Sequence, residues 1–459
     1  MASRAPASGE KRSTRRETTP AQAESMLFST KKHLDQVPAG FDLDSRPKVG
    51  VLVETTIPPV SRANLRMYWL AKVLIAEKRV MVNMVSPSKN LRSRRSYFVE
   101  WIWMNQFPGW ACHLYTRWRL PVRIWHFLAS IISLVILEVW YRRSCGRGFA
   151  ALHAWNPLAG LAAVLAGKLI RKPVFVDFTD FYSDIARTDM PLLSKPLVWL
   201  ENYVLRQARF IFVVSNQLKE HLARAHGLTP EKIHIVPDGT DSETFRPDVP
   251  TAGVRERLGI PKDAPVLVFH GDIKHDDGVD ILLKALALVA RERPDARLLI
   301  LGGGSPYFDE VCRPLIAALG LEGNVVLPGW IPHADVPAVL CACDIGAMTL
   351  RATLNHDHYL SFKLFEYWGC GKPVVVTKLK AIGEIARDGE NALVAPSGDV
   401  EAFAKAFLRL IADKELAARL GHAGRELVVR EYDWREIMKK ETAVYTAEFL
   451  DAAEPRKTR

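Results

Sequence analysis

Acidic residues stand where apolar segments of this 459-residue chain end or are interrupted. Glu366 lies within the segment LFEYWGCG, and Asp177 and Asp180 close the run VFVDFTD. A buried carboxylate accepts two hydrogen bonds at once, so Glu366 is suited to the vicinal diol of a ribose. The alternative for Glu366 is a position on a helix surface, and the alternative for the two aspartates is the capping of a helix N-terminus.

A histidine and a run of glycines also follow apolar segments. His153 stands in AALHAWNP, where a structural role and a catalytic role are both open for a lone histidine. The glycines at 302–304 are followed by SPYF and not by the GxGxxG pattern that opens a helix, which argues against an NAD site. Glycines at a strand end instead let the backbone approach a ligand closely.

The elements that position these residues alternate between strand and helix. Short apolar runs such as 48–54 and 265–271 are separated by helical segments such as 279–292. Two such sets predict an α/β protein with two doubly wound parallel-sheet domains and a linker near residue 240. Ligands of open parallel sheets lie beyond the carboxyl ends of the strands, so we expect the substrate in the cleft between the domains, with Asp177 and Asp180 facing it.

The same pattern divides the chain into four parts. We expect a disordered basic tail over 1–46, a first domain over 47–243, a second domain over 244–430, and a final segment over 431–459. The tail is polar, lacks periodicity and lacks the apolar core of a secretory signal. The six cysteines are scattered and none is in a CxxC pair, which favours buried thiols in a reducing compartment.

Four stretches of the second half resemble the nucleotide-sugar glycosyltransferases of family 4, which have the GT-B fold. They are VPDGTDSETFRP (236–247), FHGDIKHDDGVDILLKAL (269–286), LLILGGGSPYFDEV (298–311), and SFKLFEYWGCGKPVVVT (361–377) with GEIARDGENALVAPSGD after it. The resemblance implies two Rossmann-like domains that face a cleft. It also implies transfer of a sugar from a UDP- or GDP-sugar to an acceptor hydroxyl with retention of configuration, and with no metal or other cofactor. The final segment resembles the family's last helix, which crosses back to the first domain.

The resemblance implies roles for individual residues as well. It assigns Glu366 to the ribose of the donor. It assigns Asp177, Asp180 and His153 to the transferred sugar or the acceptor hydroxyl, as candidate catalytic residues. Further donor contacts are implied for residues of the matching stretches, which are Gly271, Lys274, Gly303, Ser361, Lys363 and Leu364.

The second half departs from the family pattern at the donor site. His358 stands near the position of a first glutamate that the family often carries before Glu366. Asp272 and Asp277 stand where the family usually has cations, and two acids close to a pyrophosphate repel it. We therefore expect Lys274 and Lys363 together to neutralise the pyrophosphate.

The first half departs from the pattern in the loop after its first strand. The family has a glycine-rich loop there, whereas this chain has PPVSRA at 58–63. We expect Ser61 and Arg62 to meet the acceptor or the phosphates in its place.

A basic and aromatic region, 91–147, interrupts the alternating pattern. Residues 62–147 hold 15 Lys and Arg against 3 Asp and Glu, and 7 of the 12 tryptophans precede residue 150, a combination that suits a lipid headgroup interface. The apolar core 127–137 is 11 residues long, whereas spanning a bilayer takes ~20. A spanning helix and a core helix of the first domain are the alternatives to docking on an anionic membrane surface. The residues expected to dock are Arg92, Arg94, Arg95, Trp125 and Ile132.

Three functions compete on this sequence. The first is a glycosyltransferase acting on a lipid-linked or cell-surface glycan precursor, peripheral to the cytoplasmic face of a membrane. The second is a non-catalytic membrane adaptor with a degenerate donor site, which Asp272 and Asp277 favour. The third is a nucleic-acid binder, but the aromatic residues lie in long apolar runs and not on polar strands, so we expect no nucleic-acid partner.

Overall fold

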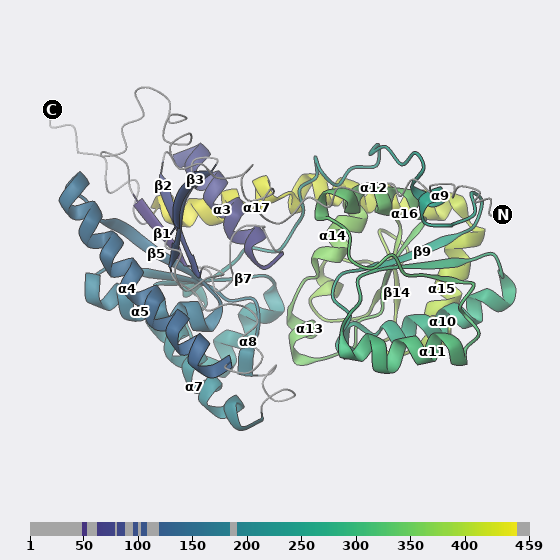
Figure 1. Cartoon of the computed structure of the whole chain (residues 1–459), viewed down its shortest axis with the longest axis horizontal. Helices are drawn as coiled ribbons and strands as arrows, with labels where there is room; N and C mark the ends of the chain where they lie inside the picture. Colours follow the sequence, from purple (N-terminus) through teal and green to yellow (C-terminus); the bar gives the residue numbers. More distant parts are fainter. Residues whose placement is uncertain are drawn as a thin grey trace, which may run out of the picture.

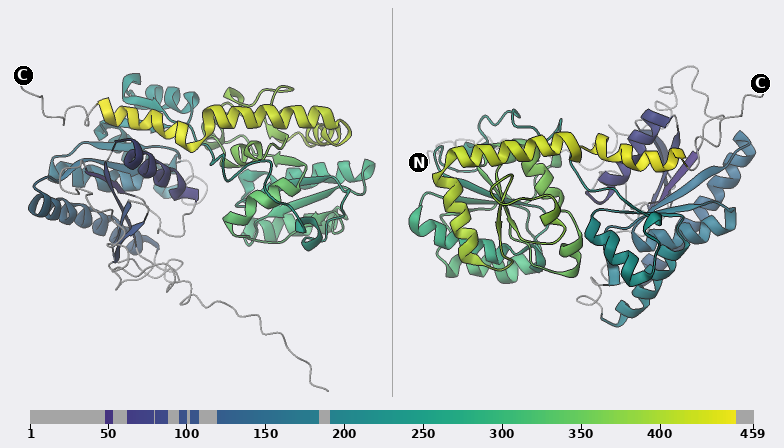
Figure 2. Two further views of the ribbon diagram at one scale, coloured as in Figure 1. Left: turned by 90° about the horizontal axis from the view of Figure 1, so that it is seen from above. Right: turned by 180° about the vertical axis from the view of Figure 1, so that it is seen from behind.

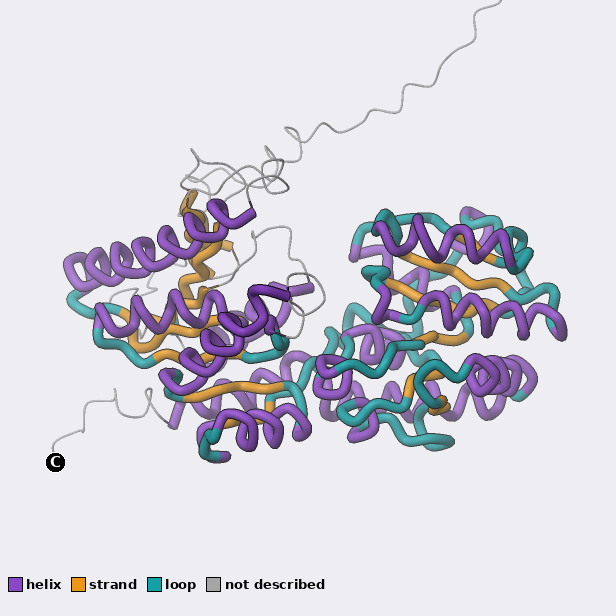
Figure 3. The backbone as a smooth tube through the Cα atoms, turned by 90° about the horizontal axis from the view of Figure 1, so that it is seen from below, coloured by secondary structure: helices purple, strands orange, loops and turns teal. Residues whose placement is uncertain are grey.

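The chain folds into two α/β domains that lie side by side (Figure 1). The computed structural model describes residues 48–52, 62–78, 80–87, 95–99, 102–107, 119–183 and 191–447. In each domain, helices cover both faces of one twisted sheet, as the layers of Figure 3 show. The predicted fold class, two Rossmann-like sheets of the GT-B type, is confirmed.

The first domain contains an eight-stranded sheet in the order β3-β4-β2-β1-β5-β6-β7-β8. All of its strand pairs are parallel except β3 with β4. Its strands are β1 (Lys48–Leu52), β2 (Met81–Pro87), β3 (Arg95–Val99), β4 (Ile102–Phe107), β5 (Phe149–Trp155), β6 (Val174–Asp177), β7 (Phe210–Val213) and β8 (Ile233–Ile235). The antiparallel edge pair β3–β4 falls in the basic, aromatic region, where the sequence pattern did not indicate strands.

Two groups of helices cover this sheet. Helix α3 (Arg62–Lys78) and the last helix, α17 (Trp434–Tyr445), share one apolar cluster with β1 and β2. On the other face, α4 (Arg119–Cys145), α5 (Asn156–Ile170) and α7 (Pro191–Gln207) lie next to one another, and α8 (Asn216–His226) follows β7. The sheet is therefore buried on both faces, which explains the continuous apolar runs of its central strands.

Helix α4 is apolar on both of its long faces. Ala129, Leu134 and Tyr141 are buried on the face toward α5 and the sheet. The opposite face is exposed and carries a stripe of apolar residues at helical spacing, Leu128, Ile132, Ile136, Val139 and Trp140. A core helix was one alternative for this segment. Packing against the core of the first domain accounts for the buried face of α4 but not for the exposed apolar face. Among the described helices, none is both long enough and apolar enough to cross a membrane.

The second domain contains a six-stranded parallel sheet in the order β11-β10-β9-β12-β13-β14. Its strands are β9 (Val266–His270), β10 (Arg297–Leu301), β11 (Val325–Val326), β12 (Ile345–Met348), β13 (Val374–Thr377) and β14 (Leu393–Ala395). Its α-helices are α9 (Val254–Arg257), α10 (Val279–Glu292), α11 (Arg313–Ala318), α12 (Val336–Ala342), α13 (Leu354–His358), α14 (Phe362–Gly369), α15 (Val400–Ala412) and α16 (Lys414–Leu427).

The chain crosses between the domains twice, at adjacent places. After α16 it returns to the first domain as α17, which lies along α3 (Figure 2). The backbone N–H of Thr240 donates to Tyr432 O at 3.0 Å, and that of Trp434 donates to Thr240 O at 3.0 Å. A Cβ atom on Gly239 would lie 2.2 Å from the Tyr432 oxygen, so this close crossing requires a glycine.

Candidate active site at the domain interface

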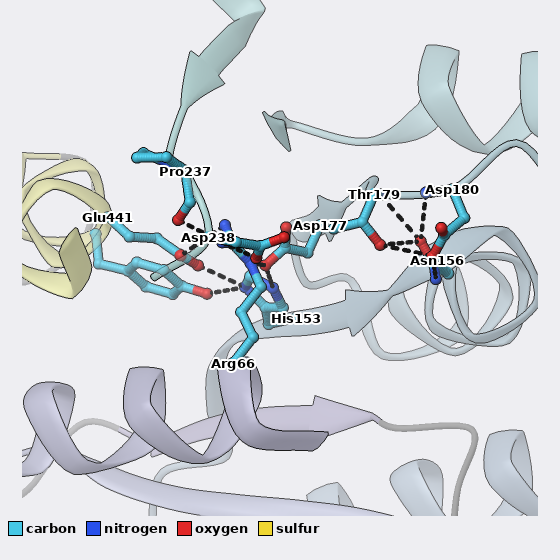
Figure 4. Close-up of polar contacts among 10 residues, drawn as sticks. Arg66, His153, Asn156, Asp177, Thr179, Asp180, Pro237, Asp238 and Glu441 are labelled. Atoms are coloured by element: carbon cyan, nitrogen blue, oxygen red, sulfur yellow. Dashed lines mark hydrogen bonds and ion pairs between the residues drawn. The ribbon is translucent and has the colours of Figure 1, made fainter. Parts of the chain in front are cut away.

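Asp180 lies just beyond the carboxyl end of β6 and is held by two neighbours (Figure 4). The Asn156 amide donates to Asp180 Oδ2 at 3.1 Å, and the Thr179 hydroxyl lies 3.0 Å from the same oxygen. Asn156 is buried, and its Oδ1 accepts from the backbone N–H of Thr179 at 3.1 Å. It has a φ of +65°, a left-handed conformation that costs energy for most residues and is more accessible to Asn. The turn at Asn156 therefore orients the Asp180 carboxylate, and the sequence alone did not reveal this turn.

Residues of the second domain approach Asp180 from the other side of the domain interface. Partial burial raises the pKa of Asp180, while the hydrogen bonds from Asn156 and Thr179 and the charges of Lys274 and His356 act in the opposite direction. The adjacent backbone N–H of Phe181 donates to Asn355 Oδ1 at 3.0 Å. The carboxyl end of the first sheet thus meets the second domain at Asp180, as the fold class predicts.

Asp177 belongs to a separate, buried charge cluster (Figure 4). Its Oδ2 lies 2.6 Å from Arg66 Nε, and the same guanidinium reaches Asp238 at 3.3 Å and Glu441 at 3.6 Å. Arg66 belongs to α3, Asp177 to β6, Asp238 to the linker and Glu441 to α17. The cluster therefore ties both crossings of the chain to the first sheet.

The single guanidinium does not balance three carboxylates in this buried cluster. Burial acts to raise the pKa of Asp177, but the charge of Arg66 and the contacts with His153 outweigh it and hold that pKa below its usual value. Burial raises the pKa of Asp238 to about 7, against the opposing effect of Arg66. Burial and the nearby Asp177 raise the pKa of Glu441 as well. In this cluster Asp177 is therefore the carboxyl group that ionises most readily, whereas Asp238 and Glu441 hold their protons to a higher pH than ordinary carboxyl groups do.

The expectation that Asp177 faces the cleft is wrong, because its side chain is fully buried behind Arg66. His153 is buried beside it and pairs with the Tyr445 hydroxyl of α17, and burial lowers the pKa of its imidazole. Ligand atoms of His153, Asp177 and Glu441 lie within 4.8 Å of one another, a spacing that could suit a metal ion. Arg66 already places a cation against two of these groups, which disfavours a metal there.

Glu366 lies in the first turns of α14 and is buried in the second domain. Its carboxylate oxygens are 3.2 Å from His270 Nε2 and 3.5 Å from His333 Nε2. His270 ends β9, whereas the His333 side chain is half exposed. Glu366 is therefore not on an outward helix surface, and it lies between two histidines that the sequence analysis did not single out.

Lys274 and Lys363, the two cations expected to neutralise the pyrophosphate, differ in their surroundings. Lys363 is buried, and its ammonium pairs with Asp277 Oδ1 at 2.6 Å. Asp277 Oδ2 also accepts from the backbone N–H of Lys274 at 3.0 Å, whereas the Lys274 side chain is exposed. One of the two acids at the donor loop thus has a cationic partner, while Asp272 is exposed.

The glycine turns and the start of α14 form the rest of this region. Gly271, Gly302 and Gly303 have positive φ angles, and a Cβ atom on Gly302 would lie 2.2 Å from Gly271 O. Ser361 and Leu364 are buried at the N-terminus of α14. Helix N-termini and glycine turns offer backbone N–H groups to anions. The indole of Trp330 is exposed and donates to Gly303 O at 3.1 Å, a position that the sequence analysis missed.

Several expected site residues lie partly or wholly outside the described part of the chain. Ser61, Arg92 and Arg94 are outside the described residues. Arg62 begins α3, Arg95 begins β3 and Trp125 lies in α4, but their side chains are not described. Ile132 is described and is 55% exposed on the apolar stripe of α4.

The fold and site define a two-domain protein of the GT-B class, with polar groups from both sheets at the interface. Residues 64–239 match the family described as "Glycosyl transferase 4-like domain", and residues 264–413 match "Glycosyl transferases group 1". The chain belongs to these family 4 glycosyltransferases, as the motifs indicated.

Individual relatives extend the comparison. A GDP-mannose-dependent alpha-(1-6)-phosphatidylinositol monomannoside mannosyltransferase of Mycolicibacterium smegmatis is 34% identical over 232 residues, which are 50% of this chain and 59% of that protein. A D-inositol 3-phosphate glycosyltransferase of Xylanimonas cellulosilytica is 29% identical over 252 residues, 53% of this chain and 58% of that protein. The chain thus spans less than two thirds of the length of these relatives.

A solved structure shows the same fold over more of the chain. The sucrose-phosphate synthase of Thermosynechococcus elongatus superposes with a TM-score of 0.72 at 19% identity, and the superposition covers 89% of this chain and 100% of that one.

Proposed function

We propose that the protein transfers a sugar from a UDP- or GDP-sugar to an acceptor hydroxyl, with retention of configuration and without a metal. The observation that carries this proposal is the contact between the domains directly beside Asp180, where the backbone N–H of Phe181 donates to Asn355 Oδ1 of the second domain at 3.0 Å. A carboxylate at this interface, with the positive charge of Lys274 on the side of the second domain, suits an acceptor hydroxyl on one side and a diphosphate on the other. The family's motifs support retention and a metal-free donor site.

We propose that Glu366 binds the donor ribose and that the α14 N-terminus binds its diphosphate. Ser361 and Leu364 lie at that N-terminus, where the helix dipole favours negative charge. Lys274 and Lys363 neutralise the phosphates once Lys363 exchanges Asp277 for a phosphate oxygen. Gly271 and Gly303 leave room for the donor at the ends of β9 and β10. In this proposal Asp180 accepts a hydrogen bond from a hydroxyl of the acceptor or the transferred sugar. Asp177 and His153 are positioning residues, which hold the buried charge cluster next to Asp180 in place.

We propose that the acceptor is a lipid-linked or cell-surface glycan precursor, reached by docking on the cytoplasmic face of an anionic membrane. The exposed apolar stripe of α4 supports this docking, and the exposed Arg142 and Arg143 follow at the end of the same helix. Apolar and basic groups together suit an anionic lipid interface. The relative from Mycolicibacterium smegmatis is named for a phosphatidylinositol monomannoside acceptor, which fits the same proposal.

A transfer assay tests this function. The full chain is incubated with a panel of UDP- and GDP-sugars and a membrane lipid extract, and mass spectrometry detects lipid species that gain one sugar. We expect one donor to give such a product and the Asp180→Asn variant to give much less. If no donor in the panel gives a product and neither UDP nor GDP binds, the adaptor with a degenerate donor site is favoured.

A further inference from the structure

A cavity of about 480 Å³ lies at the amino ends of strands β6, β7 and β8 in the first domain. Its walls are residues 167–168, 171–174 and 207–209 and Lys232, which lead into these three adjacent strands, together with Val164 of α5. The carboxyl ends of the same strands face the second domain near Asp180, so the cavity lies at the opposite edge of the sheet. It is therefore separate from the proposed donor and acceptor site.

The charged residues that line this cavity are all cationic. They are Lys168, Arg171, Lys172, Arg209 and Lys232. Within the described part of the chain, no Asp or Glu lines the cavity. Like charges around one hollow repel one another, and an anion inside it would relieve that repulsion.

A tight turn brings two of these cations to the rim. Arg171 has a φ of +56°, and the backbone N–H of Lys172 donates to Gly167 O at 2.8 Å. A Cβ atom on Gly167 would lie 2.6 Å from Val174 Cγ2, so the turn between α5 and β6 requires a glycine there. The backbone therefore fixes the positions from which Arg171 and Lys172 extend.

Stabilisation of helix ends accounts for only part of the cluster. Lys168 lies in the last turn of α5, where a cation is favoured by the helix dipole. Arg171 is the C-cap residue of α5 and Lys172 follows it, whereas Arg209 directly precedes β7 and Lys232 is half-buried just before β8. Its ammonium donates to the Arg206 carbonyl at 2.8 Å, so this cation is held at the wall.

We propose that this cavity binds a phosphate-bearing anion, as a second ligand site that does not depend on the proposed sugar transfer. Guanidinium and ammonium groups together provide charge-assisted hydrogen bonds to phosphate oxygens. The phosphate can come from an anionic lipid headgroup or from a soluble phosphate ester. Arg142, Arg143 and Arg147 are exposed before β5, at the same edge of the sheet, which favours the lipid source.

Two probes and two variants test this site on the full chain. The probes are vesicles of phosphatidylcholine with phosphatidylglycerol, followed by sedimentation, and sn-glycerol 3-phosphate, followed by calorimetry. The test variant is Arg171→Gln with Lys172→Gln. The matched control is Lys195→Gln with Arg224→Gln, which removes two exposed charges of the same domain that do not line the cavity. Thermal unfolding of each variant verifies the fold.

For a lipid headgroup, we expect the test variant to bind vesicles about 10- to 30-fold more weakly than the wild type, because each cation near an anionic surface contributes about 1 kcal/mol. The control variant should lose clearly less vesicle binding than the test variant. For a soluble phosphate, calorimetry should show binding of glycerol phosphate to the wild type and about tenfold weaker binding to the test variant. Equal binding of both probes by wild type and test variant, or an equal loss in test and control variants, would overturn the proposal. Sugar transfer to a soluble acceptor should stay at the wild-type level in both variants, so its loss points to the donor site and not to this one.

Discussion

The two ends of the strands in the first-domain sheet differ in how their charged residues are arranged. At the carboxyl ends, Asp177, Asp238 and Glu441 are buried around Arg66, and Asp180 lies beside them at the domain interface. At the amino ends, cations surround a cavity that no described acid lines. The second domain contacts the chain beside Asp180 at the first of these ends, whereas Lys168, Arg171 and Arg209 at the other end are exposed.

This difference predicts two kinds of response to substitution. A buried charge has lost its hydration, so its energy depends on one geometry and on a small number of partners. Exposed charges are screened by salt over ~8 Å and act in a roughly additive way. Substitutions at the carboxyl ends of the strands should therefore have large, specific effects on stability or activity. Substitutions at the amino ends should have graded effects on binding that depend on salt.

The largest effect is expected from Arg66→Met. This change keeps a long side chain in α3 but leaves Asp177, Asp238 and Glu441 without their shared cation. Breaking a buried ion pair by removing one partner costs about 3–5 kcal/mol. Denaturant unfolding measures the loss, and Arg209→Met at the exposed edge should change stability by less than about 0.5 kcal/mol. Similar losses in the two variants would contradict the contrast between the edges.

Asp180→Asn should reduce transfer by about 10- to 100-fold, because a hydrogen bond to a charged group contributes about 1.5–3 kcal/mol. The Asn156 and Thr179 contacts can remain, so the unfolding temperature should change little. Steady-state kinetics separates turnover from donor affinity. Wild-type turnover in this variant would remove Asp180 from the proposed site.

Ile132→Asp should remove the part of vesicle binding that resists salt. The isoleucine is exposed in the middle of the α4 stripe, and burial of such a side chain in an apolar layer contributes about 1.5–3 kcal/mol. Sedimentation at low and high salt measures both parts of the binding. Arg143→Gln is the matched control and should reduce only the salt-sensitive part. A wild-type protein that stays in the supernatant at low salt would show that α4 does not dock.

A more gradual effect concerns Asp238 and pH. Because its pKa is about 7 in the folded protein and 3.8 in the usual reference, the folded state keeps a proton that the unfolded state has released between these values. Stability contributed by this residue therefore falls as the pH rises through this window, by at most about 1.4 kcal/mol per pH unit. Asp238→Asn should flatten the dependence of unfolding free energy on pH between 5 and 7. An identical slope in both proteins would show that Asp238 does not titrate there.

Much of the fold follows from sequence because buried parallel strands leave a plain signal. Residues 174–176 and 266–269 are continuous apolar runs, and both lie in strands in which every residue is buried. The pair β3–β4 gave no such signal, because its strands, RSYFV and IWMNQF, mix polar with apolar residues at a sheet edge. Local pattern identifies the central strands better than the edge strands.

The candidate site was harder to predict because its decisive contacts are distant in sequence. Asp177 and Asp180 are three residues apart and look alike in sequence, yet one is fully buried and the other lies at the domain interface. Their difference depends on Arg66, which is 111 residues from Asp177. The left-handed Asn156 that orients Asp180 also carries no periodic signal.

Titration calorimetry with UDP and GDP tests the central claim, that the second domain binds a nucleotide-sugar donor beside Glu366. The account predicts that one of the two nucleotides binds the full wild-type chain, and that Glu366→Ala weakens this binding by about 10- to 100-fold. Glu390→Ala, at an exposed position of the same domain, should bind like the wild type. Binding of neither nucleotide to the wild type, or equal binding to wild type and Glu366→Ala, would contradict the account.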